Sequence, residues 1–551
     1  VLLPNWFPVN LYAMSSWSRT IVVPLAIMAA HKPVKRIDPR FGIRELFFKR
    51  PENWPPLRCV GLKGGTGLFS WDRFFRSINA VIKVCEQRNW LPLRRRALAK
   101  AERWMVDRFT GSDGLGAIFP PMIFSIIALR CLGYRDDSPE LRYCYERLEG
   151  LFLEEDDTLR LQPCKSPVWD TSITLRALDD AGVAPDHPAV MRAVDWLLRM
   201  QIAQPGDWSE TVNAEPGGWC FEHANDFYPD LDDTAMVVMS LVSQYAHEAE
   251  NQPRREVRLA HDELFDLSVV DDQTQATLES DERRMDRAMR AAILNRLPKA
   301  IVRAEQWMLA MQNRDGGWAA FDRNNDRQFL CYVPFADHNA MTDPSTPDLT
   351  ARVLEALGML GHRVGSPAVD RAVEYLRKNQ EADGSWFGRW GVNYIYGTWQ
   401  VLIGLNEVGV PHNDPCMVAG ANWLVSCQQP SGAWGESANS YDDPRLKGQG
   451  PATASQTAWA ILGLLAAGRK DDPAVARGIR WLVHRQRDDG TWDEPEFTGT
   501  GFPRVFYLRY HMYPMYFPLM ALSRWAARAG TGQRNEGSSG KAMYALPLAD
   551  H

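Results

Sequence analysis

The sequence lacks the features that mark secreted, metal-binding or membrane-spanning proteins. No apolar run reaches the ~18 residues that a transmembrane helix needs, and no signal peptide is visible. The nine cysteines are scattered, odd in number and form no CxxC pair, so we expect a reducing compartment with neither a disulfide framework nor a zinc site. The net charge of −6 and the pI of about 6.1 do not favour nucleic acid as a partner.

Aromatic residues are present in excess. The 551 residues include 21 tryptophans, 22 phenylalanines and 16 tyrosines, and the length predicts two or three domains. Aromatic side chains fill cores, and their faces also bind apolar or cationic ligands. Because the chain begins with Val1 instead of methionine, we expect a fragment or processed form of a longer protein.

An internal repeat organises most of the chain. In each copy an amphipathic helix ends in glutamine and a turn with Gly-x-Trp follows. The five copies are Ala193 to Gln201 with Gly206-Asp207-Trp208, Ala304 to Gln312 with Gly316-Gly317-Trp318, Ala372 to Gln380 with Gly384-Ser385-Trp386, Ala421 to Gln428 with Gly432-Ala433-Trp434, and Gly478 to Gln486 with Gly490-Thr491-Trp492. Glycine permits a left-handed backbone in the turn. We expect the glutamine and tryptophan to stabilise it.

A more apolar helix alternates with each of these, and it opens near a threonine. The threonines are Thr171, Thr234, Thr350, Thr398 and Thr457, and a sixth helix without threonine runs from about Tyr510 to Ala526. Helices that are apolar all round are buried, whereas helices with one polar face lie outside. We therefore predict an all-α fold in which residues 151–529 form an (α/α)6 barrel; an open array would instead be a solenoid.

Three further segments flank or interrupt this barrel. Residues 1–150 contain weaker copies of the repeat and predict a second, smaller α-barrel domain. Residues 246–290 are rich in Asp, Glu and Arg and predict a charged surface insertion, partly helical or disordered. Residues 530–551 include a Gly/Ser-rich stretch and predict a mobile tail.

Residues 74–96 in the first domain have the composition of an interfacial anchor. Apolar residues, among them Phe74, Phe75 and Trp90, precede the basic cluster Arg94-Arg95-Arg96. This arrangement suits contact with a membrane surface. It also suits a helix packed into the first domain, and the segment by itself does not favour either interpretation.

The stretch Tyr228-Pro229-Asp230-Leu231-Asp232-Asp233-Thr234-Ala235 concentrates three carboxylates at a helix start. We expect Pro229 at the first helical position, where a missing N–H costs nothing. Any one of these acids would be read as a helix cap. Three together repel one another, so some hold protons that others lose. Such a cluster could present an acidic carboxyl to a substrate or bind a divalent cation.

The repeat and the Asp-x-Asp-Asp-Thr-Ala motif together resemble the squalene–hopene cyclases, which are class II triterpene cyclases. Three further stretches agree with this family: Pro167 to Thr171, Gly384 to Tyr394, and Gly499 to Pro503. The resemblance covers nearly the whole chain, and it implies that an N-terminal portion of the family is missing from this sequence. It implies two α-barrel domains with an apolar cavity between them.

The resemblance also implies the reaction and its setting. Asp232 would protonate a terminal double bond of squalene, tuned by Asp230 and Asp233, and a carbocation cascade would end in hopene or hopanol. No metal or cofactor is needed. The apolar substrate implies a monotopic protein on the cytoplasmic side of a membrane, and a homodimer is one possible assembly.

The family pairs this acid with an Asp four residues before a His. Asp348 matches the Asp, but Arg352 stands at the position of the His. Taken alone, an i, i+4 Asp–Arg pair is usually a simple salt bridge. Arginine is always charged, so we expect it to make Asp232 more acidic without returning a proton to it.

Aromatic faces stabilise cations, and ten residues match the family's cavity lining. They are Trp17, Trp169, Phe221, Phe321, Trp390, Tyr396, Phe502, Phe506, Tyr510 and Tyr513. Where the family often has a Gln beside the terminating water, this chain has Phe119 and Pro120. We therefore expect a different water site and a different ratio of alkene to alcohol.

Three alternatives stay open. A class II diterpene cyclase also uses Asp-x-Asp-Asp, but it would need basic residues and usually magnesium for a diphosphate substrate. An oxidosqualene cyclase typically carries Cys at the position of Asp233. A non-catalytic α/α scaffold would explain the repeat but neither the acids nor the aromatic excess.

Overall fold

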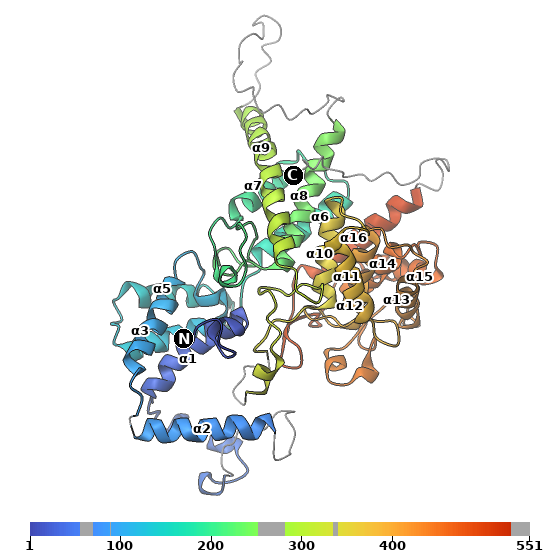
Figure 1. Cartoon of the computed structure of the whole chain (residues 1–551). Helices are drawn as coiled ribbons and strands as arrows, with labels where there is room; N and C mark the ends of the chain where they lie inside the picture. The colour runs from blue at the N-terminus through green and yellow to red at the C-terminus, as the bar shows by residue number, and fades with distance from the viewer. Residues whose placement is uncertain (55–69, 89, 252–280, 334–339, 531–551) are drawn as a thin grey trace, which may run out of the picture.

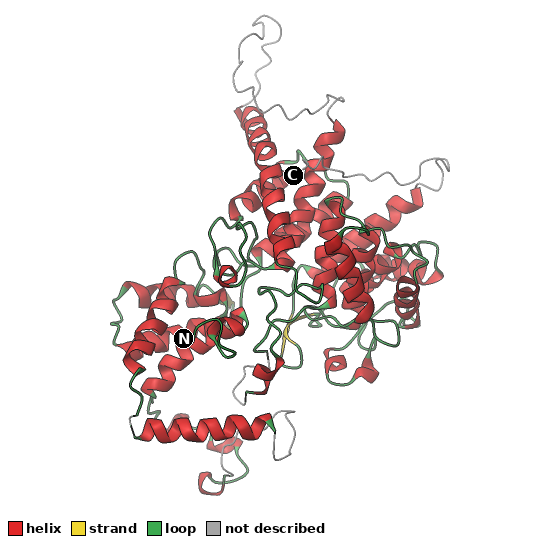
Figure 2. Ribbon diagram, in the orientation of Figure 1, coloured by secondary structure: helices red, strands yellow, loops and turns green. Residues whose placement is uncertain are grey.

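The structure is a computed structural model that describes residues 1–54, 70–88, 90–251, 281–333 and 340–530 (Figure 1). Helices dominate it, as predicted (Figure 2). The helices are α1 Ser16–His31, α2 Trp71–Gln87, α3 Arg94–Asp107, α4 Phe119–Leu132, α5 Pro139–Glu149, α6 Pro167–Asp180, α7 Pro188–Met200, α8 Leu231–Asn251, α9 Asp281–Ala310, α10 Pro347–Met359, α11 Pro367–Lys378, α12 Tyr394–Glu407, α13 Pro415–Ser426, α14 Ala454–Ala466, α15 Pro473–Arg485 and α16 Tyr513–Gly530. Two antiparallel hairpins pair β1 Phe152–Glu155 with β2 Thr158–Leu161, and β3 Gly499–Phe502 with β4 Phe506–Leu508.

Six inner helices form a closed ring. Helices α6, α8, α10, α12, α14 and α16 each pack against the next, and α16 packs back against α6. The Nε1 of Trp169 on α6 donates to the hydroxyl of Tyr513 on α16 over 3.2 Å, which ties the ring shut. Helix α14 is buried at every residue, as expected for a helix that is apolar all round. This confirms the six predicted inner helices.

The outer layer consists of α7, α9, α11, α13 and α15. Their buried residues recur on one face, as on α11 at Val369, Ala372, Val373 and Leu376. The described residues therefore place five outer helices on the ring, one fewer than an (α/α)6 barrel requires. The β1–β2 hairpin precedes α6 in the chain.

The glutamine–tryptophan turns are hydrogen-bonded as predicted, and they also connect neighbouring units. The Nε2 of Gln380 donates to the carbonyl of Gly384 at 2.9 Å and to that of Cys416, on the next outer helix, at 3.0 Å. Trp386 donates its Nε1 to Leu376 and its backbone N–H to the hydroxyl of Thr398. The recurring threonine thus binds the turn to the inner helix that follows it.

The predicted turn of the first copy is wrong. Gln201 donates to the carbonyl of Gly217, and Trp219, not Trp208, bonds to Thr234 and Leu197. An extra loop, residues 202–216, separates Gln201 from its glycine. Trp208 instead packs edge-on against Trp307, with ring centroids 5.9 Å apart.

Residues 1–149 enclose a second apolar cluster, which is distinct from that of the ring and is formed by α1, α3, α4 and α5. Helix α2 lies apart from these helices at the edge of the molecule (Figure 1). Its contact with the body includes Trp71 stacked on Phe329, with ring centroids 5.7 Å apart. Among the described residues, no helix combines the length and the apolar character that crossing a membrane requires.

Two predicted segments fall mainly outside the described residues. The central part of the charged insertion, 252–280, is not described, and the flanking residues extend α8 and α9. Of the predicted tail, residues 531–551 also lie outside the description.

Candidate active site

The acid motif lies at the start of inner helix α8. Asp230 is the residue before the helix, and its Oδ1 accepts the backbone N–H of Asp233 at 2.8 Å, so it caps the helix. Pro229 therefore lies one residue before the cap, not at the predicted first helical position. The backbone N–H groups of Asp230 and Leu231 donate to Trp219 and Ala320 respectively. These bonds attach the motif to the turns beside it.

Burial raises the pKa of all three carboxyl groups in the motif. For Asp232 the pKa is about 6, because burial and the charge of Asp348 raise it while Arg352 lowers it. Burial also raises the pKa of Asp230 and that of Asp233, and these two carboxyls interact directly. The cluster therefore holds protons at a pH where an exposed aspartate would have none.

Asp232 has a buried cation as its partner. The Nε of Arg352 lies 2.5 Å from its Oδ1, and the Nη2 of Arg352 donates to the hydroxyl of Tyr396 at 2.7 Å. Arg352 is 1% exposed, whereas Asp232 keeps 16% of its side chain exposed. This places the carboxyl of Asp232 at the cavity surface with the guanidinium behind it.

Asp348 does not pair with Arg352 as an i, i+4 salt bridge would. Its Oδ2 accepts the backbone N–H groups of Arg389 at 2.7 Å and Trp390 at 2.9 Å. Within the described residues, no ion pair joins Asp348 to Arg352, because Arg352 points toward Asp232 instead. Asp348 thus acts on the acid only through its charge and holds the loop before α12.

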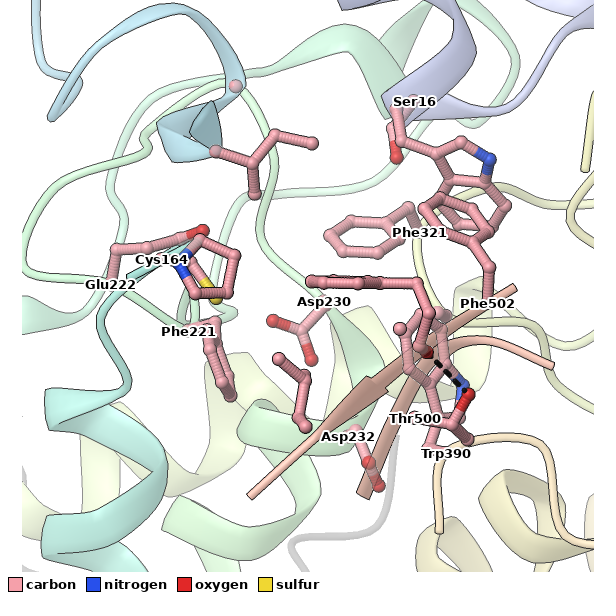
Figure 3. Close-up of a pocket in the computed structure, with 18 of the residues that line it drawn as sticks. Ser16, Cys164, Phe221, Glu222, Asp230, Asp232, Phe321, Trp390, Thr500 and Phe502 are labelled. Carbon is pink, nitrogen blue, oxygen red and sulfur yellow. Dashed lines mark hydrogen bonds between the residues drawn. The ribbon is translucent and has the colours of Figure 1, made fainter. Parts of the chain in front are cut away.

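The acid faces a cavity of about 390 Å³. In Figure 3, Asp230 and Asp232 lie between Phe221 on one side and Phe321, Phe502 and Trp390 on the other. All ten aromatic residues expected from the resemblance line this cavity, and Phe119 and Pro120 line it as well. They come from distant parts of the chain: Trp17 from α1, Phe119 and Pro120 from α4, and the rest from the ring and its loops.

Aromatic side chains at one wall pack edge to face. Trp17 lies 5.9 Å from Phe321, 6.2 Å from Trp390 and 6.0 Å from Phe502 between ring centroids. Its Nε1 donates to the carbonyl of Ala340 at 2.6 Å, which fixes the indole. Three rings thus pack against the indole of Trp17 and hold the wall of the cavity in a defined shape.

Several cavity residues were not identified from the sequence. Glu222 and Asn225 are buried in the wall and bonded to each other at 3.2 Å, and burial keeps the pKa of Glu222 well above its ordinary value. Cys164 and Tyr228 also line the cavity. Glu222 directly follows the predicted Phe221, and this adjacency was the one feature of the sequence that could have placed Glu222 in the cavity wall. The β3–β4 hairpin, which supplies Thr500 and Phe502, was not predicted.

Models of known families match almost the entire chain. Residues 1–157 match the squalene-hopene cyclase N-terminal domain, and residues 165–267 and 268–527 match the C-terminal domain. The chain belongs to the squalene–hopene cyclase family.

Relatives in this family are similar over nearly the full chain. A probable squalene–hopene cyclase of Sinorhizobium fredii is 42% identical over 531 residues, which is 95% of this chain and 74% of the relative. The squalene–hopene cyclase of Bradyrhizobium diazoefficiens is 41% identical over 97% of this chain and 74% of its own length. The dammaradiene synthase of Dryopteris crassirhizoma is 36% identical over 96% of this chain and 73% of its own length.

Proposed function

We propose that the protein cyclises squalene to hopene or hopanol, with Asp232 as the proton donor. The observation that carries this proposal is the carboxyl of Asp232, protonated at mildly acidic pH and paired with Arg352, at the surface of an aromatic cavity. Family membership and the similarity to enzymes named squalene–hopene cyclase support squalene as the substrate.

The first step is a proton transfer to a terminal alkene. The O–H bond of Asp232 breaks, the π electrons form a C–H bond with the proton, and the adjacent carbon becomes cationic. The carboxylate left behind lies against Arg352, which stabilises it. Asp230 and Asp233 serve as neighbours that hold protons and limit negative charge around the acid.

The cascade then proceeds inside the aromatic wall. Ring faces attract positive charge, so Trp169, Phe221, Tyr510 and the other lining aromatics lower the energy of successive carbocations. The last cation loses a proton to water to give hopene, or captures water and releases a proton to give hopanol. We assign this ending to the region of Phe119 and Pro120, whose apolar side chains give a bound water few partners.

The composition of the cavity favours a hydrocarbon over a prenyl diphosphate. Of the lining residues in the described part of the chain, none is lysine, arginine or histidine. A diphosphate would need such groups to compensate its charge. A purely structural scaffold would have no use for a buried carboxyl cluster, whose burial is costly.

Incubation with squalene in detergent, followed by gas chromatography and mass spectrometry, tests the proposal. We expect pentacyclic hydrocarbon or alcohol, and the ratio of the two reports the terminating region. Geranylgeranyl diphosphate serves as the competing substrate. Turnover of the diphosphate without turnover of squalene would contradict the proposal and indicate a diterpene cyclase.

We also assign residues 1–150 to a smaller helical domain and residues 151–529 to the catalytic ring, and we place α2 at a membrane surface. Support for the membrane contact comes from exposed apolar residues along one segment: Phe74 at 52%, Val81 at 63% and Trp90 at 74% exposure. Arg94 to Arg96 follow directly, which suits anionic lipid headgroups.

Flotation with anionic liposomes tests this contact. Replacing Val81 and Trp90 by Ser is expected to reduce the bound fraction several-fold, since both side chains are exposed apolar anchors. The matched control is Leu159→Ser with Val364→Ser, which removes two exposed apolar side chains from other surfaces. Equal flotation of both double variants would refute the assignment.

A further inference from the structure

A second buried arginine lies behind the aromatic wall. The guanidinium carbon of Arg389 is 4.2 Å from the ring centroid of Trp390, 5.7 Å from that of Phe502 and 5.9 Å from that of Trp17. All three rings line the cavity, but Arg389 itself does not. The cation therefore contacts the wall from outside, while the substrate would contact it from inside.

Carboxylates act on the charge of Arg389 without pairing with it. Within the described residues, it forms no ion pair, and its buried Nη1 has no hydrogen-bond partner. Asp348 and Asp343 act on it through charge, but both are engaged with backbone N–H groups. Burial lowers the pKa of Arg389, yet arginine stays charged at any physiological pH.

A cation on one side of a ring weakens that ring's attraction for a second cation on the other side. The two positive charges repel across a region of low dielectric, and the π electrons are drawn toward the first. We propose that Arg389 is a positioning residue that keeps the carbocation from pausing at the wall formed by Trp17, Trp390 and Phe502. This inference rests on the proposed cyclisation.

The consequence concerns the products. A carbocation that pauses loses a proton from the neighbouring carbon to water, and the C–H electron pair becomes a double bond. The cascade then ends before all rings have closed. With Arg389 in place the cation at this wall is short-lived, so ring closure outruns proton loss.

Substitution of Arg389 tests the inference through the product ratio. In Arg389→Met the charge is lost, and we expect partly cyclised hydrocarbons to rise roughly tenfold relative to pentacyclic products. Arg389→Lys keeps the charge and is expected to give the wild-type ratio. The control is Arg485→Met, which removes an exposed arginine 5.8 Å from the ring of Trp481, and neither residue lines the cavity. Arg389→Gln replaces the Met variant if the latter does not fold.

Each possible result of this experiment either supports or overturns the proposed role of Arg389. An altered ratio in the Met or Gln variant with an unaltered ratio in the Lys variant supports the inference, whatever happens to the total yield. An unchanged ratio in every folded neutral variant, or the same change in Lys and Met, would assign Arg389 a packing role only. Absence of any cyclised product from the wild type would overturn the proposed function, and this inference with it.

Discussion

Arg352 and Arg389 lie against aromatic rings of the same cavity, but in different charge environments. The guanidinium of Arg352 is 5.0 Å from the ring of Trp169 and pairs with Asp232. Arg389 lies 4.2 Å from the ring of Trp390 and, among the described residues, pairs with no carboxylate. A paired arginine stabilises the anion that proton transfer leaves behind, whereas an unpaired one repels positive charge. In the proposed mechanism, one residue type thus serves initiation at one position and progress at the other.

Asp232→Asn gives the largest expected effect, because it removes the carboxyl group that pairs with Arg352. An amide cannot donate a proton to an alkene, so we expect turnover to fall by about 10³-fold or more, measured as product per time from squalene. Circular dichroism should report an intact fold. Asp370→Asn, which changes an exposed carboxyl on α11, should leave the rate unchanged. Substantial turnover by Asp232→Asn would reassign the acid.

Arg352→Met converts the acid end into a site without its cation. Because Arg352 lowers the pKa of Asp232, its loss raises that pKa above the wild-type value of about 6. Asp232 must be protonated to act, so the wild-type rate should fall as the pH rises through about 6, and the fall should move to higher pH in the variant. The weaker acid should also lower the maximal rate by roughly 10²-fold. A pH–rate profile that keeps its midpoint would contradict this role.

The two arginines should differ in what they change. Arg352→Met is expected to change the rate and its pH dependence, with the product ratio preserved, since the acid acts before the rings close. Arg389→Met is expected to shift the product ratio with the pH midpoint preserved. Measuring both quantities on both variants separates the roles. If each variant changed both quantities equally, the comparison between initiation and progress would fail.

The smallest effects are expected from substitutions in the glutamine–tryptophan turns. These variants show how a lower free energy of unfolding, without a change in the cavity, affects the protein. Gln380→Leu removes two hydrogen bonds, one within its turn and one to the next outer helix, and should lower the free energy of unfolding by about 2 kcal/mol. Among the residues that the structure describes, the Gln486 side chain bonds its own turn only, so Gln486→Leu should cost about half as much. Thermal unfolding measures both. A change in product ratio in either variant would show that the ratio also reports general loosening.

Much of this site could be predicted because local sequence fixes it. The period of the apolar residues specified the inner helices, and all ten aromatic residues that the resemblance named line the cavity. Predictions failed where residues distant in sequence determine which groups form hydrogen bonds or ion pairs. Gly206-Asp207-Trp208 fits the turn pattern locally, but Thr234 receives the N–H of Trp219 instead. The helix spacing taken alone favoured a salt bridge between Arg352 and Asp348, whereas Arg352 pairs with Asp232, the acid whose pKa it was expected to lower.

The contact between α6 and α16 affects how the chain can fold while it is being synthesised. Trp169 and Tyr513 meet across 344 residues of chain, and both line the cavity. During translation the first inner helix leaves the ribosome long before the last one, so for most of that time its cavity-facing side has no partner. Contacts between residues so far apart in sequence form late and slowly. The nascent chain must therefore keep an apolar surface unpaired until its last inner helix emerges, which makes this interval the one in which aggregation or chaperone binding competes with folding.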